Sequence, residues 1–371
     1  MLIRDAELDL GARRADLRIA DGRIAAVAPS LVPHAGEAVI EAQGAALIPG
    51  LRDHHLHLWA YAASLDSLVC GPPQVHDAGT LREALRRRDA ELASGRWLRG
   101  IGYHPSVAGE IDRAWLDACV GLRPLRIQHR SGRLWILNTA ALHALHVDES
   151  QAGASPLERD AQGRFTGRLY DADDWLRARI GRQRPDLHRA SRCLAAHGIT
   201  ALTDTTPGNG PEHCAEFAQA QHSGELLQDL CVMGDARLDL ASDVSGSRLR
   251  RGPHKFHLHE HELPAFEILV TAVRASHAAR RGAAFHCVTR TELIFALAAL
   301  EQAGADEHDR IEHAGVVPPE LVAPLVQRGV TVVTQPGFVH ERGDAYLADV
   351  EADDQPWLYR LRGLLDAGIP L

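Results

Sequence analysis

The stretch Leu47-Ile-Pro-Gly-Leu-Arg-Asp-His-His-Leu-His-Leu58 decides how the rest of the chain is interpreted. It starts as an apolar approach, breaks at Pro49-Gly50 and continues as a short predicted strand that ends near His57. Because side chains alternate between the two faces of a strand, His55 and His57 point the same way, while Leu56 points into packing on the other face. Two imidazoles on one face of a strand end can chelate a metal ion.

The His-x-His pair alone is a weak signal, because the chain contains 22 histidines and such a pair can arise by chance. The surroundings strengthen it. Lys255, His286 and His313 each lie on a strand-like segment, and a helical stretch separates each from the next. Metal-type ligands at the ends of successive strands are what a (β/α)-barrel active site requires.

The second half of the chain alternates regularly between strand and helix patterns, which predicts parallel βαβ units. The expected strands are 199–204, 230–233, 255–259, 283–286, 310–313 and 330–334, and the expected helices are 186–197, 211–223, 264–280, 291–303 and 318–328. With the His-x-His strand these make seven strands, and Gly368-Ile-Pro-Leu371 resembles the approach to an eighth. We therefore predict an α/β fold, a TIM-like (β/α)8 barrel over residues 47–371 that is incomplete at its C-terminus.

Two further parts accompany this barrel. Residues 1–46 contain short strand patterns and an Asp21-Gly22 hairpin turn, which predict a small N-terminal β-sandwich module that serves as a scaffold. After a predicted helix at 80–95, an insertion at about 97–175 interrupts the βα rhythm and is dense in aromatic and hydrogen-bonding residues. It is either a substrate lid or a small packed subdomain.

Composition narrows the class of protein. The chain has 371 residues, 45% of them hydrophobic, and a net charge of -9 without a basic run, which argues against a nucleic-acid partner and favours a small-molecule substrate. Its 6 cysteines form no Cys-x-x-Cys pair, so neither a zinc finger nor a disulfide framework is expected. The start lacks a signal-peptide pattern and no apolar run approaches a membrane span, so we expect a cytoplasmic protein without a membrane partner.

Lys255 is the only lysine among the 40 basic residues. A sequence that uses arginine everywhere else has kept one primary amine, which indicates that amine chemistry rather than charge is needed there. The alternative is a stray surface lysine.

The chain resembles the metal-dependent amidohydrolase superfamily, and within it the amidohydrolase-3 branch, from about residue 1 to its last residue. The matching pieces stand in order, one per strand: Ile48-Pro-Gly-Leu-Arg-Asp-His-His-Leu-His57, Gly252-Pro-His-Lys255, Ala284-Phe-His-Cys287, Asp309-Arg-Ile-Glu-His-Ala314 and Val333-Thr-Gln-Pro336.

The resemblance implies a metal centre of one or two divalent ions, with zinc as the expected metal. It places His55 and His57 on one ion, His286 and His313 on a second, and a carboxylated Lys255 between them; Lys255, His286 and His313 are also the implied catalytic groups. The implied reaction is hydrolysis of an amide-like C–N bond by metal-activated water. A carbamate suits this position because an unmodified ammonium would be repelled by two cations.

One feature departs from the family pattern. Family members carry an Asp at the end of the eighth strand, beyond the point where this sequence ends, so we expect a truncated and catalytically impaired chain. An unpaired edge on such a barrel favours self-association, for example as a homodimer. Alternatives to amide hydrolysis are deamination of an aminated ring and a metal-binding barrel without catalysis. Deaminases generally place a glutamate shortly after the fifth-strand histidine, where this chain has Cys287-Val-Thr289.

Substrate contacts are expected from the insertion. His129 and Arg130 are candidates because family members often have a histidine before a segment like Trp135-Ile-Leu-Asn138, and Tyr103 belongs to the same aromatic group. Arg130 could bind a carboxylate or a carbonyl bidentately. The alternating histidines within 257–261 resemble a ligand set, but the family pattern leaves them no role, and we expect a loop at the barrel mouth.

Overall fold

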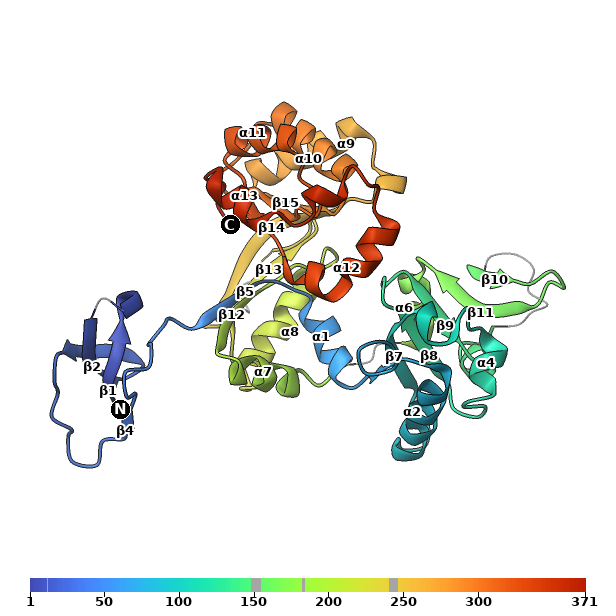
Figure 1. The fold of residues 1–371 in the computed structure, drawn as a ribbon, viewed down its shortest axis with the longest axis horizontal. Helices are drawn as coiled ribbons and strands as arrows, with labels where there is room; N and C mark the ends of the chain where they lie inside the picture. The colour runs from blue at the N-terminus through green and yellow to red at the C-terminus, as the bar shows by residue number, and fades with distance from the viewer. Residues whose placement is uncertain (12, 148–154, 182–183, 240–245) are drawn as a thin grey trace.

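The computed structural model describes residues 1–11, 13–147, 155–181, 184–239 and 246–371. Among these residues the strands form three sheets: a small N-terminal sheet, a seven-stranded parallel sheet, and a six-stranded sheet inserted into the connection after its first strand. Figure 1 shows the three parts along the longest axis of the molecule, with the parallel sheet in the middle.

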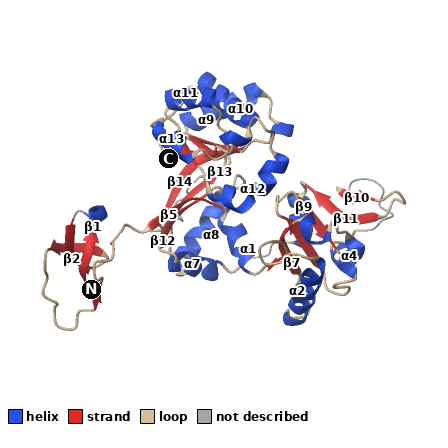
Figure 2. Ribbon diagram, in the orientation of Figure 1, coloured by secondary structure: helices blue, strands red, loops and turns tan. Residues whose placement is uncertain are grey.

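The N-terminal sheet has the order β3-β2-β1-β4. Its elements are β1 (Leu2–Leu8), η1 (Asp9–Gly11), β2 (Arg13–Ala20), β3 (Arg23–Ala28) and β4 (Val39–Glu41). Asp21 and Gly22 form the predicted hairpin turn with φ of 49° and 71°, which is the backbone that a type I′ turn requires. The described residues of this part form one sheet, whereas the sequence suggested a sandwich. A loop joins this sheet to the barrel (Figure 2).

The parallel sheet has the order β17-β16-β15-β14-β13-β12-β5, as expected for consecutive βαβ units. Its strands are β5 (Leu51–Leu56), β12 (Ile199–Asp204), β13 (Asp229–Gly234), β14 (Leu249–His257), β15 (Ala283–Cys287), β16 (Arg310–His313) and β17 (Thr331–Val333). Its helices are α1 (Leu58–Leu65), α7 (Leu187–Ala196), α8 (Pro211–His222), η3 (Glu260–Glu262), α9 (Phe266–Ala278), α10 (Arg290–Ala303), α11 (Pro319–Arg328), α12 (Gly337–Asp349), η4 (Gln355–Trp357) and α13 (Leu361–Asp366).

Two hydrogen bonds show how far this sheet curls into a barrel. His55 on the edge strand β5 bonds Glu312 on β16, near the opposite edge, at 2.6 Å, and Arg310 donates to the backbone oxygen of His54 at 2.9 Å. The backbone N–H of Val332 on β17 donates to the carbonyl of Pro370 at 2.8 Å, so the last residues lie beside this edge, where the eighth strand was expected. The result is a nearly closed seven-stranded barrel of the TIM-like type.

β14 begins at Leu249, six positions before the predicted start at Lys255. Gly252-Pro253 resembles a strand boundary in sequence, since proline cannot donate to a sheet. The pairing register with β13 shifts between Val232 and Gly234, which accommodates this irregular segment. The strand therefore continues through it and ends at His257.

The inserted sheet has the order β10-β11-β9-β8-β7-β6. Its elements are β6 (Leu68–Val69), α2 (Ala78–Glu91), β7 (Leu98–Tyr103), α3 (Pro105–Ala108), α4 (Arg113–Asp117), β8 (Leu125–His129), β9 (Leu134–Leu137), α5 (Thr139–Ala144), β10 (Leu157–Arg159), β11 (Phe165–Tyr170) and α6 (Asp173–Ile180). The inserted part thus begins before residue 97 and has two buried apolar clusters of its own, which gives it the character of a packed subdomain.

In the described residues, no helix is both long and apolar enough to cross a membrane.

Candidate active site

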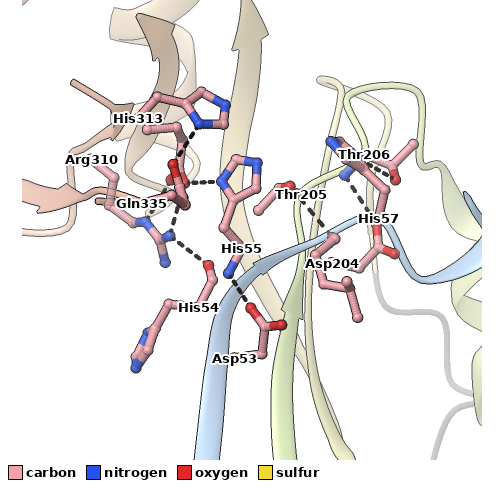
Figure 3. A network of polar contacts seen from close by, with 12 residues as sticks. Asp53, His54, His55, His57, Asp204, Thr205, Thr206, Arg310, His313 and Gln335 are labelled. Atoms are coloured by element: carbon pink, nitrogen blue, oxygen red, sulfur yellow. Dashed lines mark hydrogen bonds and ion pairs between the residues drawn. The ribbon is translucent and has the colours of Figure 1, made fainter. Parts of the chain in front are cut away.

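His55 lies at the end of β5 and is fixed on both sides. Its backbone N–H donates to the carboxylate of Asp53 at 2.9 Å, and its ring Nδ1 lies 2.6 Å from Oε2 of the fully buried Glu312 (Figure 3). Burial raises the pKa of Glu312, but the hydrogen bond from His55 and the charge of Arg310 outweigh it and bring this pKa down to about 2. The ionised carboxylate therefore accepts from Nδ1–H of His55, which leaves the Nε2 lone pair of that ring free.

His57 follows β5 and caps the start of α1. Its Nδ1 lies 3.0 Å from the hydroxyl of Thr206, and its ring centroid lies 5.6 Å from that of His55. The fully buried Asp204 holds this junction together, because it accepts from the backbone N–H of Leu58 at 2.7 Å and of Thr206 at 3.0 Å. β12 thereby fixes the end of β5 (Figure 3).

His286 on β15 and His313 on β16 bring two more rings to the same place. The ring centroid of His313 lies 4.5 Å from that of His55 and 4.7 Å from that of His286. Nδ1 of His313 lies 2.7 Å from Oε1 of Gln335, and donation to this amide oxygen leaves the Nε2 lone pair of His313 free. We call His55, His57, His286 and His313 the histidine cluster.

Burial favours the neutral imidazole in His57, His286 and His313. It lowers the pKa of His286 to about 2 and that of His313 to about 4, and the charge of a neighbouring histidine acts in the same direction in both. It also lowers the pKa of His57. Neutral imidazole is the form that binds metal ions.

Lys255 belongs to the same centre. It lies on β14, is 5% exposed, and its Nζ finds no hydrogen-bond partner in the part of the chain that the structure describes. Burial lowers its pKa to about 8, although Glu312 acts in the opposite direction. Its charge in turn depresses the pKa values of His57, His286 and His313, which places the amine within electrostatic reach of both halves of the cluster.

The donor set fits divalent metal ions in its chemistry. The cluster supplies two pairs of imidazoles, and a buried nitrogen without a partner stands beside them. Among the described residues, no three His, Cys, Asp or Glu side chains already form a metal-holding group.

The other histidines of the β14 end adjoin this centre. The ring of His257 lies 4.7 Å from that of His286, and the ring of His259 lies 4.2 Å from that of His257, so both stand at the mouth of the barrel next to the cluster. His261 lies in the short η3 turn.

The three substrate candidates of the insertion lie apart from the histidine cluster. The buried Tyr103 donates its hydroxyl to the carbonyl of Gly109 at 2.5 Å. His129 ends β8, and its ring lies 5.9 Å from that of His104. Arg130 follows it, half-buried. Within the described residues, no hydrogen bond or ring contact joins any of the three to the cluster.

Sequence reasoning did not assign roles to Glu312, Asp204 and Gln335. Each orients a cluster residue or its strand end, and each comes from a strand or loop far away in sequence. Asp204 had a usable signal, because it ends a largely apolar predicted strand, where a carboxylate needs a buried partner. Glu312 had none, because its predicted strand is mostly polar.

Comparisons with known proteins agree with this architecture. The model of the amidohydrolase family matches residues 38–371. An N-substituted formamide deformylase from Arthrobacter pascens is 24% identical over 95% of this chain and 75% of its own length. Uncharacterised metal-dependent hydrolases from Pyrococcus horikoshii and Pyrococcus furiosus share the fold, with TM-scores of 0.73 and 0.71 and identities of 17% and 18%. The matches cover 99% and 100% of this chain and 80% and 83% of those chains.

Proposed function

Because the chain belongs to the amidohydrolase family, we propose that it is a metal-dependent hydrolase that cleaves an amide-like C–N bond of a small molecule. The observation that carries the proposal is the histidine cluster beside Lys255, whose buried Nζ is unpartnered among the described residues. The similarity to an N-substituted formamide deformylase supports the choice of bond.

In this proposal His55 and His57 hold one divalent ion, zinc in the first instance, and His286 and His313 hold a second. When bound, such ions polarise a carbonyl and lower the pKa of water to roughly 7. Glu312 and Gln335 orient two of the ligands. Glu312 accepts from Nδ1–H of His55 and Gln335 accepts from Nδ1–H of His313, so the Nε2 lone pair of each ring is free to bind a metal ion.

Lys255 bridges the two sites as a carbamate in this scheme. The neutral amine attacks carbon dioxide, the N–C bond forms as one C–O π bond opens onto oxygen, and the proton of the nitrogen passes to solvent. An ordinary lysine, whose pKa is 10.5, is almost entirely protonated at pH 7.5, but a pKa of about 8 leaves roughly a quarter of the side chain neutral at that pH. Burial thus prepares this amine for carboxylation.

The surroundings of His286 favour amide hydrolysis over deamination. The first glutamate after His286 is Glu292, and both of its oxygens are engaged: Oε2 accepts from the backbone N–H groups of Val288 and Thr289, and Oε1 from that of Glu260. A carboxylate tied to the backbone in this way caps α10 and is not free to carry a proton to a substrate.

The test uses N-butylformamide as a simple N-substituted formamide and follows formate release by the zinc-loaded chain. Replacing His55 and His286 with Ala, singly, is expected to abolish release, whereas His188→Ala on the exposed face of α7 should leave it unchanged. Release that survives both cluster substitutions and treatment with a chelator contradicts the proposal. Ammonia release from aminopyrimidines in place of formate release would favour the deaminase.

A further inference from the structure

The ends of β7 and β8 carry the same short motif, His-x-Ser, at His104-Pro-Ser106 and His129-Arg-Ser131. The two strands are parallel neighbours, Tyr103 pairs with His129 in their register, and the two histidine rings lie 5.9 Å apart. Neither ring belongs to the histidine cluster.

Both rings are held in the same tautomer. The backbone N–H of Ser106 donates to Nδ1 of His104 at 3.3 Å, and the backbone N–H of Ser131 donates to Nδ1 of His129 at 3.1 Å. The hydroxyl of each serine lies 2.8 Å from the same nitrogen and is able to donate to it as well. A nitrogen that accepts from an N–H carries no hydrogen, so in each neutral ring the hydrogen is on Nε2. Burial lowers the pKa of both histidines, which favours the neutral form. Each ring therefore presents one N–H donor away from its own backbone.

Arg130 supplies the third donor. Its backbone N–H is fixed to the carbonyl of Tyr103 at 2.8 Å, while its guanidinium has no ion pair within 4 Å in the described parts of the chain. Arg130 directly follows His129 in the chain, and its charge lowers the pKa of both His104 and His129. We call His104, His129 and Arg130 the donor cluster.

In the described residues, neither carboxylate near the donor cluster forms an ion pair with Arg130. Glu110 is paired with Arg168. Asp349, at the end of α12, raises the pKa of His104 against the stronger effect of burial, yet it forms no ion pair with Arg130 among the described residues. Two neighbouring ring N–H donors and a guanidinium on the adjacent residue, which has no ion pair in the described residues, are suited to an anionic oxygen.

A charge of the barrel acts on the donor cluster. Asp349 belongs to the barrel helix α12, and its charge reaches His104. Asp171, which follows β11 of the inserted sheet, accepts two hydrogen bonds from Arg133, which lower its pKa, and the charge of His259 lowers that pKa further. His259 adjoins the histidine cluster through His257, so the charges of the inserted sheet and of the barrel mouth act on one another.

We propose that the donor cluster is a subsite for a carboxylate group of the substrate. The inference rests on the proposed function, because it places the anionic end of the substrate on the inserted sheet while the scissile bond lies at the histidine cluster. Arg130 binds the carboxylate with its planar fork, and the two Nε2–H groups complete its oxygen contacts.

The first arm of the test measures binding alone. Two probes of the same shape, 3-phenylpropionate and 3-phenylpropionamide, are titrated calorimetrically into the metal-free chain. The acid is expected to bind roughly ten- to a hundred-fold more tightly than the amide, which is the range for a hydrogen-bonded charge. Arg130→Gln should remove this preference. Arg130→Lys should retain part of it because the charge remains and the fork is lost. Arg87→Gln, an exposed arginine of α2, is the matched control and should change nothing.

Equal binding of the two probes by the wild-type chain overturns the proposal, and so does a preference that survives Arg130→Gln. If the Gln variant does not fold, Arg130→Lys still tests the proposal. An unchanged preference for the acid over the amide in the Lys variant argues against a bidentate contact. Nitrogen-15 NMR of the histidine rings is a second readout: hydrogen on Nε2 in both His104 and His129 is expected, and hydrogen on Nδ1 contradicts the donor assignment.

The second arm compares hydrolysis of N-formyl-β-alanine with that of N-butylformamide. Arg130→Gln should lower kcat/KM for the acid about ten-fold or more relative to the value for the neutral compound. A chain that hydrolyses neither compound refutes the proposed function, while the binding arm still decides on the carboxylate subsite.

Discussion

Glu312 contributes both to the stability of the barrel and to the metal binding that we propose. Its carboxylate is fully buried and accepts from Nδ1 of His55 at 2.6 Å and from Nε of Arg310 at 2.8 Å. The Arg310 side chain is itself only 13% exposed. Glu312→Gln keeps the shape but removes the negative charge, so a buried guanidinium loses its counter-ion. Breaking a buried pair from one side costs about 3–5 kcal/mol.

That cost predicts a fall in the thermal midpoint of the barrel of roughly 10 °C, since 1 kcal/mol shifts a domain of this size by about 2–4 °C. The same substitution replaces the anionic acceptor of His55 with a neutral amide oxygen and so weakens the hydrogen bond that orients this ring, and metal affinity should fall by about 10- to 100-fold. The assays are calorimetric unfolding of the metal-free chain and competitive zinc titration. Glu301→Gln is the control, because this glutamate pairs with Arg328 while 74% exposed and should matter little.

The reasoning about Glu312 is refuted if Glu312→Gln unfolds within about 2 °C of the wild type and binds zinc equally well, because about 1 kcal/mol is far below the cost of an uncompensated buried charge.

Three further predictions concern separate parts of the molecule. Lys255→Met should leave the metal-free barrel at least as stable as the wild type, because it removes a buried amine that has no partner among the described residues, yet lower zinc affinity about ten-fold or more; unchanged affinity argues against a ligand role. The hydrogen bond from Arg18 lowers the pKa of Glu37 from 4.5 to about 2, so this pair stabilises the N-terminal sheet fully above pH 4.5 and loses its effect as the pH falls toward 2. Hydrogen exchange in the N-terminal sheet should show this loss of stability in the wild type, and the Glu37→Gln variant should not show it. An equal pH dependence in the wild type and the variant contradicts the prediction. Phe285→Ala removes a fully buried ring stacked on Phe256 and should cost about 3–5 kcal/mol in denaturant unfolding of the barrel, whereas a cost below about 1 kcal/mol would mean that this core is not packed as described.

The alternation of strands and helices in the barrel could be predicted because each element is defined by a local sequence pattern. Strand β12 has the predicted bounds, 199–204, and helix α10 begins one residue before its predicted start at 291. Both are continuous apolar or amphipathic runs between clear boundaries. The start of β14 could not be predicted, since Gly252-Pro253 gives a break signal that pairing with β13 overrides.

The histidine cluster could be predicted in part from the sequence, but the residues that orient its rings could not. The histidines at strand ends follow from pattern and resemblance, and the structure brings His55, His57, His286 and His313 into one chain of ring contacts. The bond from His55 to Glu312 joins residues 257 positions apart on strands that are not neighbours in the sheet. It depends on the curl of the whole sheet, which no local pattern encodes.

The inserted sheet shows the same limit. Its aromatic and basic residues marked it as a lid or a subdomain, but the shared tautomer of His104 and His129 depends on backbone donors whose direction only the folded turns define.

The central claim, that the histidine cluster and Lys255 form a two-ion metal centre, is tested most directly by elemental analysis of the purified chain. We expect about two divalent ions per wild-type chain and about one in His286→Ala, because that change removes a ligand of only one of the paired sites. His188→Ala should retain the wild-type content. A metal content that is equal in the wild type and in His286→Ala contradicts the account.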